Sequence, residues 1–449
     1  MENIKIKQVE YPYLERPVEI YERECGHKIV FAYKKSTLVN ISSWVKTGSI
    51  NENNENNGIS HFLEHLMFKG TNKRKAGEFD KILESRGAVV NAATWKDYTF
   101  YYVTIPQGSD GRNFKDTLEL HADMMLNPVI PENEIGLPFD LNDTEVKTKR
   151  ERHVVIEEIK MRKDQPWTKV YNQLNRNMYT SHPYKRDVIG TEQIISTIPR
   201  ETILDYYKEF YTPNNITTIV VGDLNPEEVI PMIAKEFDFK GRKNRVNENY
   251  PIDIPTSETK YVEGYSKINT GFLMFGYLGA KANDTKAALV MEMLAYLMGQ
   301  GQSSRLYQTL IEKIEKPIFN IVATDYYHFK DGGNFMIEAN FKPEEKDEAI
   351  RLIKEQIEKI LQNGITEQEL KKAKKKLKVG FAVNAETVSE IAETIGFYMT
   401  VCEDLECVNE YAKLLDEITL EDVNAIAQEY LDLNKAVISV LMPESYNKD

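Results

Sequence analysis

Two segments of the chain share one pattern, an amphipathic helix that leads into an apolar strand. Residues 200–210 and 420–430 have apolar positions three and four apart, as expected for helices with one buried face. Each is followed by a short polar turn and a β-branched run that predicts a strand. Asn214 and Asn434, which lie in the two turns, are 220 positions apart. The pattern therefore predicts a duplicated chain.

A charged stretch with two prolines, residues 241–258, separates the two copies and predicts a linker. We therefore expect an N-terminal half over residues 1–240 and a C-terminal half over residues 259–449. Strands and helices come in blocks within each half. This arrangement predicts an α+β fold in which each half has a mainly antiparallel sheet packed by helices.

The most distinctive polar positions lie on a predicted helix within residues 58–71. His61, Glu64 and His65 share one face of it, because residues three and four apart do so in an α-helix. Two imidazoles at this spacing can bind one tetrahedral zinc ion, and a carboxylate between them can accept a proton from water. A core helix could also hold two hydrogen-bonded histidines without a metal.

A catalytic zinc site needs a third protein ligand. The apolar spacing after residue 150 predicts a helix that ends before Pro166 and carries Glu151 and Glu158 two turns apart on one face. Periodicity does not choose between Glu157 and Glu158, because neighbouring residues point about 100° apart. Five further histidines are also candidates: His27, His121, His153, His182 and His328.

Composition narrows the classes of partner. The net charge of −13 argues against binding to nucleic acid or to an anionic membrane surface. The sequence has no run of 18 apolar residues and no signal-peptide core at its start, so we expect a cytoplasmic protein. Cys25, Cys402 and Cys407 are odd in number and lack the spacing of metal ligands, which predicts free thiols.

Three segments together resemble the pitrilysin/insulinase family of zinc peptidases, and in particular its processing-peptidase branch. They are residues 58–71 with the order His-x-x-Glu-His, residues 87–94 with an aromatic strand after them, and residues 154–159. The separation of 93 positions between His65 and Glu158 is longer than is usual in the family. We expect the additional residues in a surface loop within residues 132–149.

The resemblance implies a role for each site residue. His61, His65 and Glu158 would bind the zinc ion, Glu64 would be the general base, and Glu151 a supporting carboxylate. The second half has no His-x-x-Glu-His motif, so we expect one zinc ion per chain.

Residues 87–105 predict a hairpin next to the metal-binding helix. An extended peptide could add to its edge strand, where main-chain hydrogen bonds give affinity without demanding a sequence. The family binds substrate at this edge, which makes Asn91 and Ala92 candidate substrate contacts. Asn91 could instead bond its own backbone, which is a common role for Asn.

One part of the second half departs from the family pattern. Family members that act alone or as homodimers have an Arg and, seven residues later, a Tyr that stabilise the tetrahedral intermediate. Here Ile311 stands at the Arg position and Ile318 or Phe319 at the Tyr position. Either a related partner subunit supplies both groups, which we favour, or Tyr326 or Tyr327 takes the second role.

The sequence therefore predicts a zinc metalloendopeptidase that hydrolyses unfolded or extended peptides and is the catalytic subunit of a heterodimer. In this interpretation zinc activates a water molecule and Glu64 accepts its proton. The alternative is a non-catalytic assembly or scaffold subunit, because the family also includes members that have lost the zinc residues. The intact set of His61, Glu64, His65 and Glu158 argues against that alternative.

Overall fold

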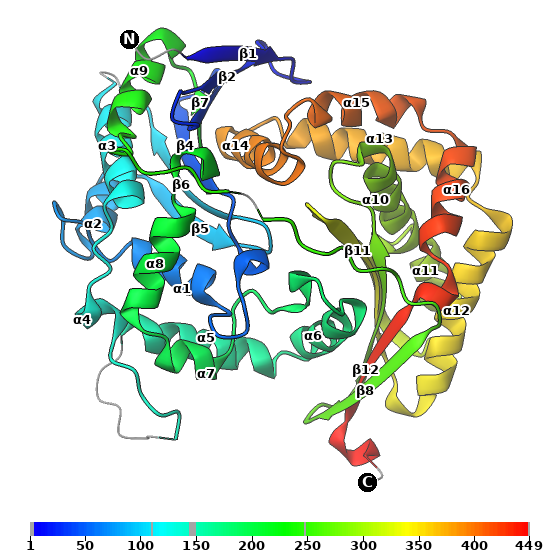
Figure 1. Ribbon diagram of the computed structural model, residues 1–449. Helices are drawn as coiled ribbons and strands as arrows, with labels where there is room; N and C mark the ends of the chain where they lie inside the picture. Colours follow the sequence, from blue (N-terminus) through cyan, green and yellow to red (C-terminus); the bar gives the residue numbers. More distant parts are fainter. Residues whose placement is uncertain (1–3, 109–110, 143–149, 247, 448–449) are drawn as a thin grey trace. The chain divides into compact units, whose positions relative to one another are not determined.

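The computed structural model describes residues 4–108, 111–142, 150–246 and 248–447. The chain forms two compact units, each built on one β-sheet (Figure 1). The first unit comprises residues 1–160, 186–249 and 381–409. The second comprises residues 161–185, 250–380 and 410–449. Each unit has its own apolar core.

The sheet of the first unit has seven strands among the described residues, in the order β1-β2-β3-β7-β4-β6-β5. All neighbouring strands are antiparallel except β3 and β7, which are parallel. The strands are β1 Lys5–Val9, β2 Val18–Glu22, β3 Lys28–Tyr33, β4 Leu38–Val45, β5 Val89–Thr94, β6 Thr99–Pro106 and β7 Ile216–Gly222.

The sheet of the second unit has five strands among the described residues, in the order β10-β11-β9-β12-β8. Only β8 and β12 are parallel. The strands are β8 Lys260–Ser266, β9 Gly271–Gly279, β10 Phe319–Phe329, β11 Gly332–Phe341 and β12 Val437–Pro443.

The two sheets have the same topology once β1 and β2 are set aside. Read from the parallel pair outward, the first runs β3-β7-β4-β6-β5 and the second runs β8-β12-β9-β11-β10. The repeated turns noted in the sequence precede β7 and β12, which take the same place in their sheets. The prediction of an α+β fold with two mainly antiparallel sheets packed by helices is therefore confirmed.

The helices of the first unit pack mainly on strands β3 to β7 of its sheet. They are α1 Ile59–Met67, α2 Glu78–Ser85, α3 Arg112–Leu126, α4 Glu132–Ile135, most of α5 Glu151–Asp164, α7 Glu192–Thr197, α8 Arg200–Phe210, α9 Pro226–Glu236 and α14 Val388–Phe397. The second unit contains α6 Pro166–Met178, α10 Thr285–Gly299, α11 Arg305–Tyr307, α12 Lys346–Asn363, most of α13 Glu367–Val383, most of α15 Cys407–Glu417 and α16 Leu420–Tyr430. None of the helices in the described ranges is both long and apolar enough to cross a membrane.

Local predictions agree closely with these bounds. The helices predicted at residues 200–210 and 420–430 are α8 and α16. Helix α5 ends at Asp164, before Pro166, and residues 89–106 form the predicted hairpin of β5 and β6. The loop expected within residues 132–149 begins with α4, whereas residues 143–149 lie outside the described part.

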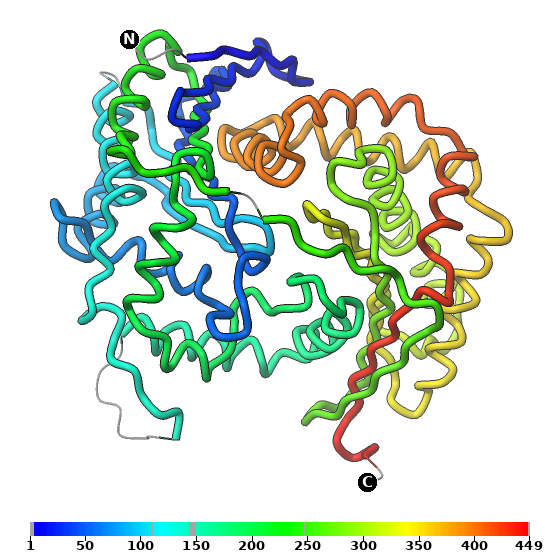
Figure 2. The backbone as a smooth tube through the Cα atoms, viewed as in Figure 1, coloured from blue at the N-terminus to red at the C-terminus, as the bar shows by residue number. Residues whose placement is uncertain are grey.

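Each half of the sequence contributes one helix to the unit that contains most of the other half. Helix α6 packs on β9 and β12 of the second sheet, and α14 packs on β4 and β7 of the first sheet. Gln165 is the single residue between α5 and α6. Figure 2 traces the backbone in colour from the N-terminus in blue to the C-terminus in red. The stretch expected as a linker, residues 241–258, is divided between the units: residues up to 249 belong to the first and residues from 250 to the second. The division into halves at that stretch stays a prediction about the sequence repeat.

Close approach at a glycine fixes how α14 lies on its sheet. A Cβ atom added at Gly396 would lie 1.9 Å from Cε2 of Trp44, whose side chain is 1% exposed. We predict that Gly396→Ala lowers the free energy of unfolding by about 1 to 3 kcal/mol, as overpacking of a dense core does. Denaturant unfolding followed by circular dichroism measures the change.

The matched control is Gly380→Ala in α13, where an added Cβ meets no atom within 4 Å. Alanine is favoured over glycine in a helix, so this variant should be as stable as the wild type or more stable. Equal unfolding midpoints for the two variants would contradict the packing argument.

Candidate metal centre

Three potential metal ligands come together where α1 and α5 meet. The Nε2 atoms of His61 and His65 lie 3.7 and 3.6 Å from Oε2 of Glu158. The potential ligand atoms of the three residues all lie within 4.8 Å of one another. In the described part of the chain this is the only such group of three or more His, Cys, Asp and Glu side chains.

The N-terminus of α1 is held by a buried carboxylate. Glu52 accepts hydrogen bonds from the backbone N–H groups of Gly58 at 2.8 Å and Ser60 at 2.9 Å, and from Nδ2 of Asn57 at 2.7 Å. Burial raises the pKa of Glu52, and these bonds oppose the shift. A negative group at a helix N-terminus satisfies its unpaired N–H donors and complements its dipole.

The start of helix α5 is anchored by Arg152, whose side chain is 1% exposed. Its guanidinium donates to the backbone carbonyls of Gly136, Ile195 and Ile198. Three hydrogen bonds from one planar group restrict both the position and the rotation of the helix start. Glu158 follows Arg152 on the same helix, so this anchor also sets the position of its carboxylate.

The choice between the adjacent glutamates is resolved by geometry. The side chain of Glu157 is 70% exposed and pairs with Lys160 at 2.9 Å on the outer face of α5. The side chain of Glu158 is 23% exposed and faces the two imidazoles. Glu158 is therefore the candidate ligand.

Glu151 lies beside the three-residue group rather than within it. Its Oε2 atom is 3.3 Å from Nδ1 of His65, and its Oε1 atom is 2.6 Å from Nζ of Lys69. Burial alone would raise the pKa of Glu151, but the bonds with His65 and Lys69 bring it below its usual value. A carboxylate on the second imidazole nitrogen fixes the orientation of a metal-binding histidine.

The same contacts control the protonation of His65. Burial acts to lower its pKa, but hydrogen bonds to Glu151 and Glu158 and the charge of Glu64 outweigh burial and raise the pKa to about 9. A metal ion at this position would take the place of that proton.

Glu64 lies on α1 between the two histidines and is 9% exposed. It is outside the group of three potential ligands. Oγ1 of Thr94, the last residue of β5, donates to its Oε2 atom at 2.6 Å. Its carboxylate is therefore held by the neighbouring sheet.

Asn91 and Ala92 lie on β5, which pairs only with β6 in the described residues. Oδ1 of Asn91 accepts a hydrogen bond from the backbone N–H of Ala92 at 2.9 Å. Asn91 thus makes the local backbone contact that was the alternative to a substrate contact. Its contact with a peptide stays a prediction.

The other five histidines lie outside the group. His27 and His121 are buried and bond Thr218 and Ser43 at 2.9 Å. The remaining three have partners of other kinds: His153 stacks on Phe139, His182 lies 3.4 Å from Asp331, and His328 lies 3.8 Å from Glu292. In the described part of the chain, Cys25, Cys402 and Cys407 form no disulfide.

In the second unit, Ile311 is half-buried against the apolar core. Tyr326, one of two alternatives for the expected Tyr, is 8% exposed and donates to the carbonyl of Ala280 at 2.8 Å. Its hydroxyl is committed within the unit, which argues against a role on substrate. Tyr327 is half-buried, with its ring 6.4 Å from that of Tyr171.

Sequence reasoning missed three residues that support the site: Glu52, Lys69 and Thr94. Lys69 follows His65 by four positions but lies two residues beyond the end of α1 at Met67, so helical spacing does not place it. Glu52 and Thr94 act through contacts that depend on the folded loop and hairpin, so no periodic pattern marks them.

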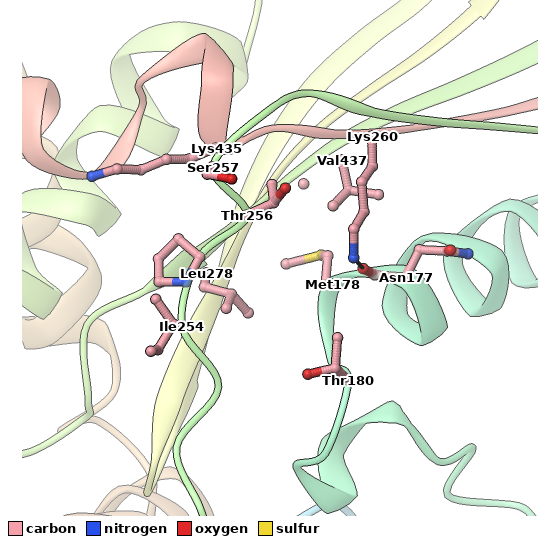
Figure 3. A pocket seen from close by; sticks show the side chains of 12 residues that line it. Asn177, Met178, Thr180, Ile254, Thr256, Ser257, Lys260, Leu278, Lys435 and Val437 are labelled. Atoms are coloured by element: carbon pink, nitrogen blue, oxygen red, sulfur yellow. Dashed lines mark hydrogen bonds between the residues drawn. The ribbon is translucent and has the colours of Figure 1, made fainter.

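A cavity of about 380 Å³ in the second unit is separate from the metal-binding group. It lies between the end of α6, residues 254–257 and the strands β8, β9 and β12 (Figure 3). Nζ of Lys260 donates to the carbonyl of Asn177 at 3.2 Å, and the hydroxyl of Thr256 donates to the carbonyl of Glu258. These polar groups already have partners within the protein.

Two family models match the chain. The model described as "Insulinase (Peptidase family M16)" matches residues 28–192, and the model described as "Peptidase M16 inactive domain" matches residues 197–377. The first match contains the metal-binding group. The second covers most of the half that lacks the His-x-x-Glu-His motif.

Several known proteins are similar to this chain over most of its length. The zinc protease PqqE of Helicobacter pylori is 29% identical over 91% of this chain and 88% of its own. A protein of Bacillus subtilis described as "Uncharacterized zinc protease YmxG" is 27% identical over 92% of this chain and 95% of its own. The crystal structure of a protease from Helicobacter pylori superposes with a TM-score of 0.82 at 26% identity, over 98% of this chain and 100% of that chain. Together with the His61, His65 and Glu158 group, these matches show that the chain belongs to the insulinase family, peptidase family M16, and is a zinc metalloprotease of that family.

Proposed function

We propose that this zinc metalloprotease is an endopeptidase for unfolded or extended peptides, with His61, His65 and Glu158 as zinc ligands and Glu64 as general base. The observation that carries the proposal is that the polar side chains of α1 have different partners. The two histidines meet Glu158, whereas Glu64 points to Thr94 and is not one of the potential ligands. Proteases of this type need a carboxylate that does not bind the metal.

The donor set fits zinc. Two imidazole nitrogens and one carboxylate oxygen are a common ligand set for catalytic zinc, which keeps one position open. When bound, zinc supplies a Lewis acid that polarises a carbonyl group and lowers the pKa of water. Glu151 orients the imidazole of His65, and Lys69 balances part of the negative charge.

Glu64 carries the proton in this mechanism. Its carboxylate accepts a proton from the attacking water and returns it to the amine of the leaving peptide. Its low exposure keeps bulk water away from the carboxylate while the proton is held there.

The edge of β5 offers a place for the peptide. Trp95 N–H bonds the carbonyl of Tyr98, so the alternation of antiparallel pairs directs the main chain of Ala92 and Thr94 away from β6. A peptide pairing with this edge would displace the bond between Asn91 and Ala92. Main-chain pairing accepts many sequences, which suits a substrate defined by its extended conformation.

We also propose that a related partner subunit completes the site. Ile311 cannot donate a hydrogen bond to an oxyanion, and Tyr326 is committed to Ala280. Arg305, nearby in the sequence, is engaged by both carboxylate oxygens of Glu369. A heterodimer explains these features better than a homodimer, which would supply the same residues. The cytoplasmic location expected from the sequence stays a prediction.

The ligand assignment is tested by two adjacent substitutions on α5. Glu158→Gln should abolish stoichiometric zinc binding, because an amide is a poor ligand for zinc, whereas Glu157→Gln should retain one zinc ion per chain. Atomic emission spectroscopy after dialysis measures the number of zinc ions bound per chain in each variant. Loss of zinc from the Glu157 variant alone would reverse the assignment.

The general base is tested by Glu64→Gln. This change should lower kcat for a quenched fluorogenic basic peptide by about 100- to 10,000-fold while leaving zinc bound.

The partner subunit is tested with the same peptide. We expect full wild-type activity only when a second insulinase-family chain from the same organism is added. Full activity of the chain alone would overturn the heterodimer proposal and leave the role of Glu64 intact.

Strand addition predicts that affinity grows with peptide length. For peptides of about five to about twelve residues with the same cleavage site, KM should fall as residues are added. The matched control is a peptide with N-methyl groups at alternate backbone positions, which removes main-chain donors without changing side chains. Binding along β5 would be contradicted if KM did not change with peptide length, or if the N-methylated peptide had the same KM as the unmodified peptide of equal length.

A further inference from the structure

Thr94 is the residue of β5 that contacts the proposed general base. Its Oγ1 atom lies 2.6 Å from Oε2 of Glu64, a short hydrogen bond of the kind made to an ionised carboxylate. Both side chains are 9% exposed, so water competes little for this bond. A carboxylate otherwise rotates easily about its terminal bond.

Neighbouring hydroxyls define the direction of this hydrogen bond. Oγ1 of Thr99 donates its proton to the carbonyl of Thr47 at 2.9 Å, because a carbonyl can only accept. The Thr94 and Thr99 hydroxyls are 3.3 Å apart, a longer contact than the one to Glu64. An ionised carboxylate also only accepts, so the proton of Thr94 is directed to Glu64.

Thr94 also belongs to the strand that would bind the peptide. Its side chain faces α1, whereas its main chain faces away from β6, toward the edge of the sheet. Thr94 would therefore contact both the carboxylate of Glu64, through its side chain, and a peptide paired with this edge, through its main chain. No periodic sequence signal marks this connection.

We propose that Thr94 is a positioning residue that holds the Glu64 carboxylate in the orientation needed to accept the proton from water. The inference rests on the proposed role of Glu64 and adds the residue that orients it. It acts on the chemical step, so it should affect kcat rather than KM or zinc binding.

The first test compares Thr94→Val with Thr94→Ser in the full-length chain, under the conditions in which the wild type cleaves the fluorogenic peptide. Valine keeps the shape of threonine without its hydroxyl, and we expect kcat per bound zinc to fall about 10- to 100-fold, the size of one hydrogen bond to a charged group. Serine keeps the hydroxyl and should restore kcat to within about threefold of wild type. Thr94→Ala provides a second hydroxyl-free variant if the valine variant does not fold.

The matched control is Thr99→Val, which removes a neighbouring buried hydroxyl without removing the donor to Glu64. Its kcat should stay within about threefold of the wild type. Wild-type kcat in Thr94→Val, or equal losses in Thr94→Val and Thr94→Ser, would overturn the inference. If Glu64→Gln were fully active, the proposed function would fail instead, so the two failures are distinguishable.

A second test does not depend on activity. Thr94→Val should lower the midpoint of thermal unfolding of the zinc-free chain in the wild-type background, and lower it much less in a Glu64→Ala background, because the bond is then already lost. Thr99→Val should cause the same shift in both backgrounds. Equal shifts for Thr94→Val in the two backgrounds would show that the hydroxyl does not couple to Glu64 and would overturn the inference.

Discussion

The approach of one carboxylate to two imidazoles is the constraint that the metal-binding group places on the first unit. Oε2 of Glu158 lies within 3.7 Å of both His61 and His65, although 93 positions separate Glu158 from His65 in the sequence. Two helices must therefore be fixed independently. Glu52 fixes the start of α1, and Arg152 fixes the start of α5. Both anchors are buried charged groups with several hydrogen-bond partners, which is the condition under which a buried charge is tolerated.

The sequence was most informative where a feature is local. Helical spacing was enough to bring His61, Glu64 and His65 to one face, and apolar periodicity placed α8 and α16 at their observed bounds. Periodicity could not separate Glu157 from Glu158, because both positions are helical and the difference lies in what each faces. That choice needed the position of α1, which is a tertiary property. The hydrogen bonds of Glu52 and Thr94 are also tertiary.

The two sheets share a strand order but differ in whether a metal-binding helix accompanies them. Their strands follow the same order, yet only the first is accompanied by the His-x-x-Glu-His helix. The helix that follows β9 in the second unit is α10, which is long and buried almost throughout. The two copies therefore share one strand order, whereas among the described residues the metal-binding group is present in the first copy alone.

The exchange of α6 and α14 has a consequence for how such a chain can evolve. Helix α6 is encoded in the first half of the sequence and covers the second sheet, whereas α14 is encoded in the second half and covers the first sheet. A gene fragment for residues 1–240 would therefore specify a sheet without its α14 cover and a helix without its sheet. Each half of the sequence therefore depends on a helix that the other half encodes, so we expect neither half to fold when the other is deleted. Half of the chain could lose its chemistry and still be retained by selection for folding.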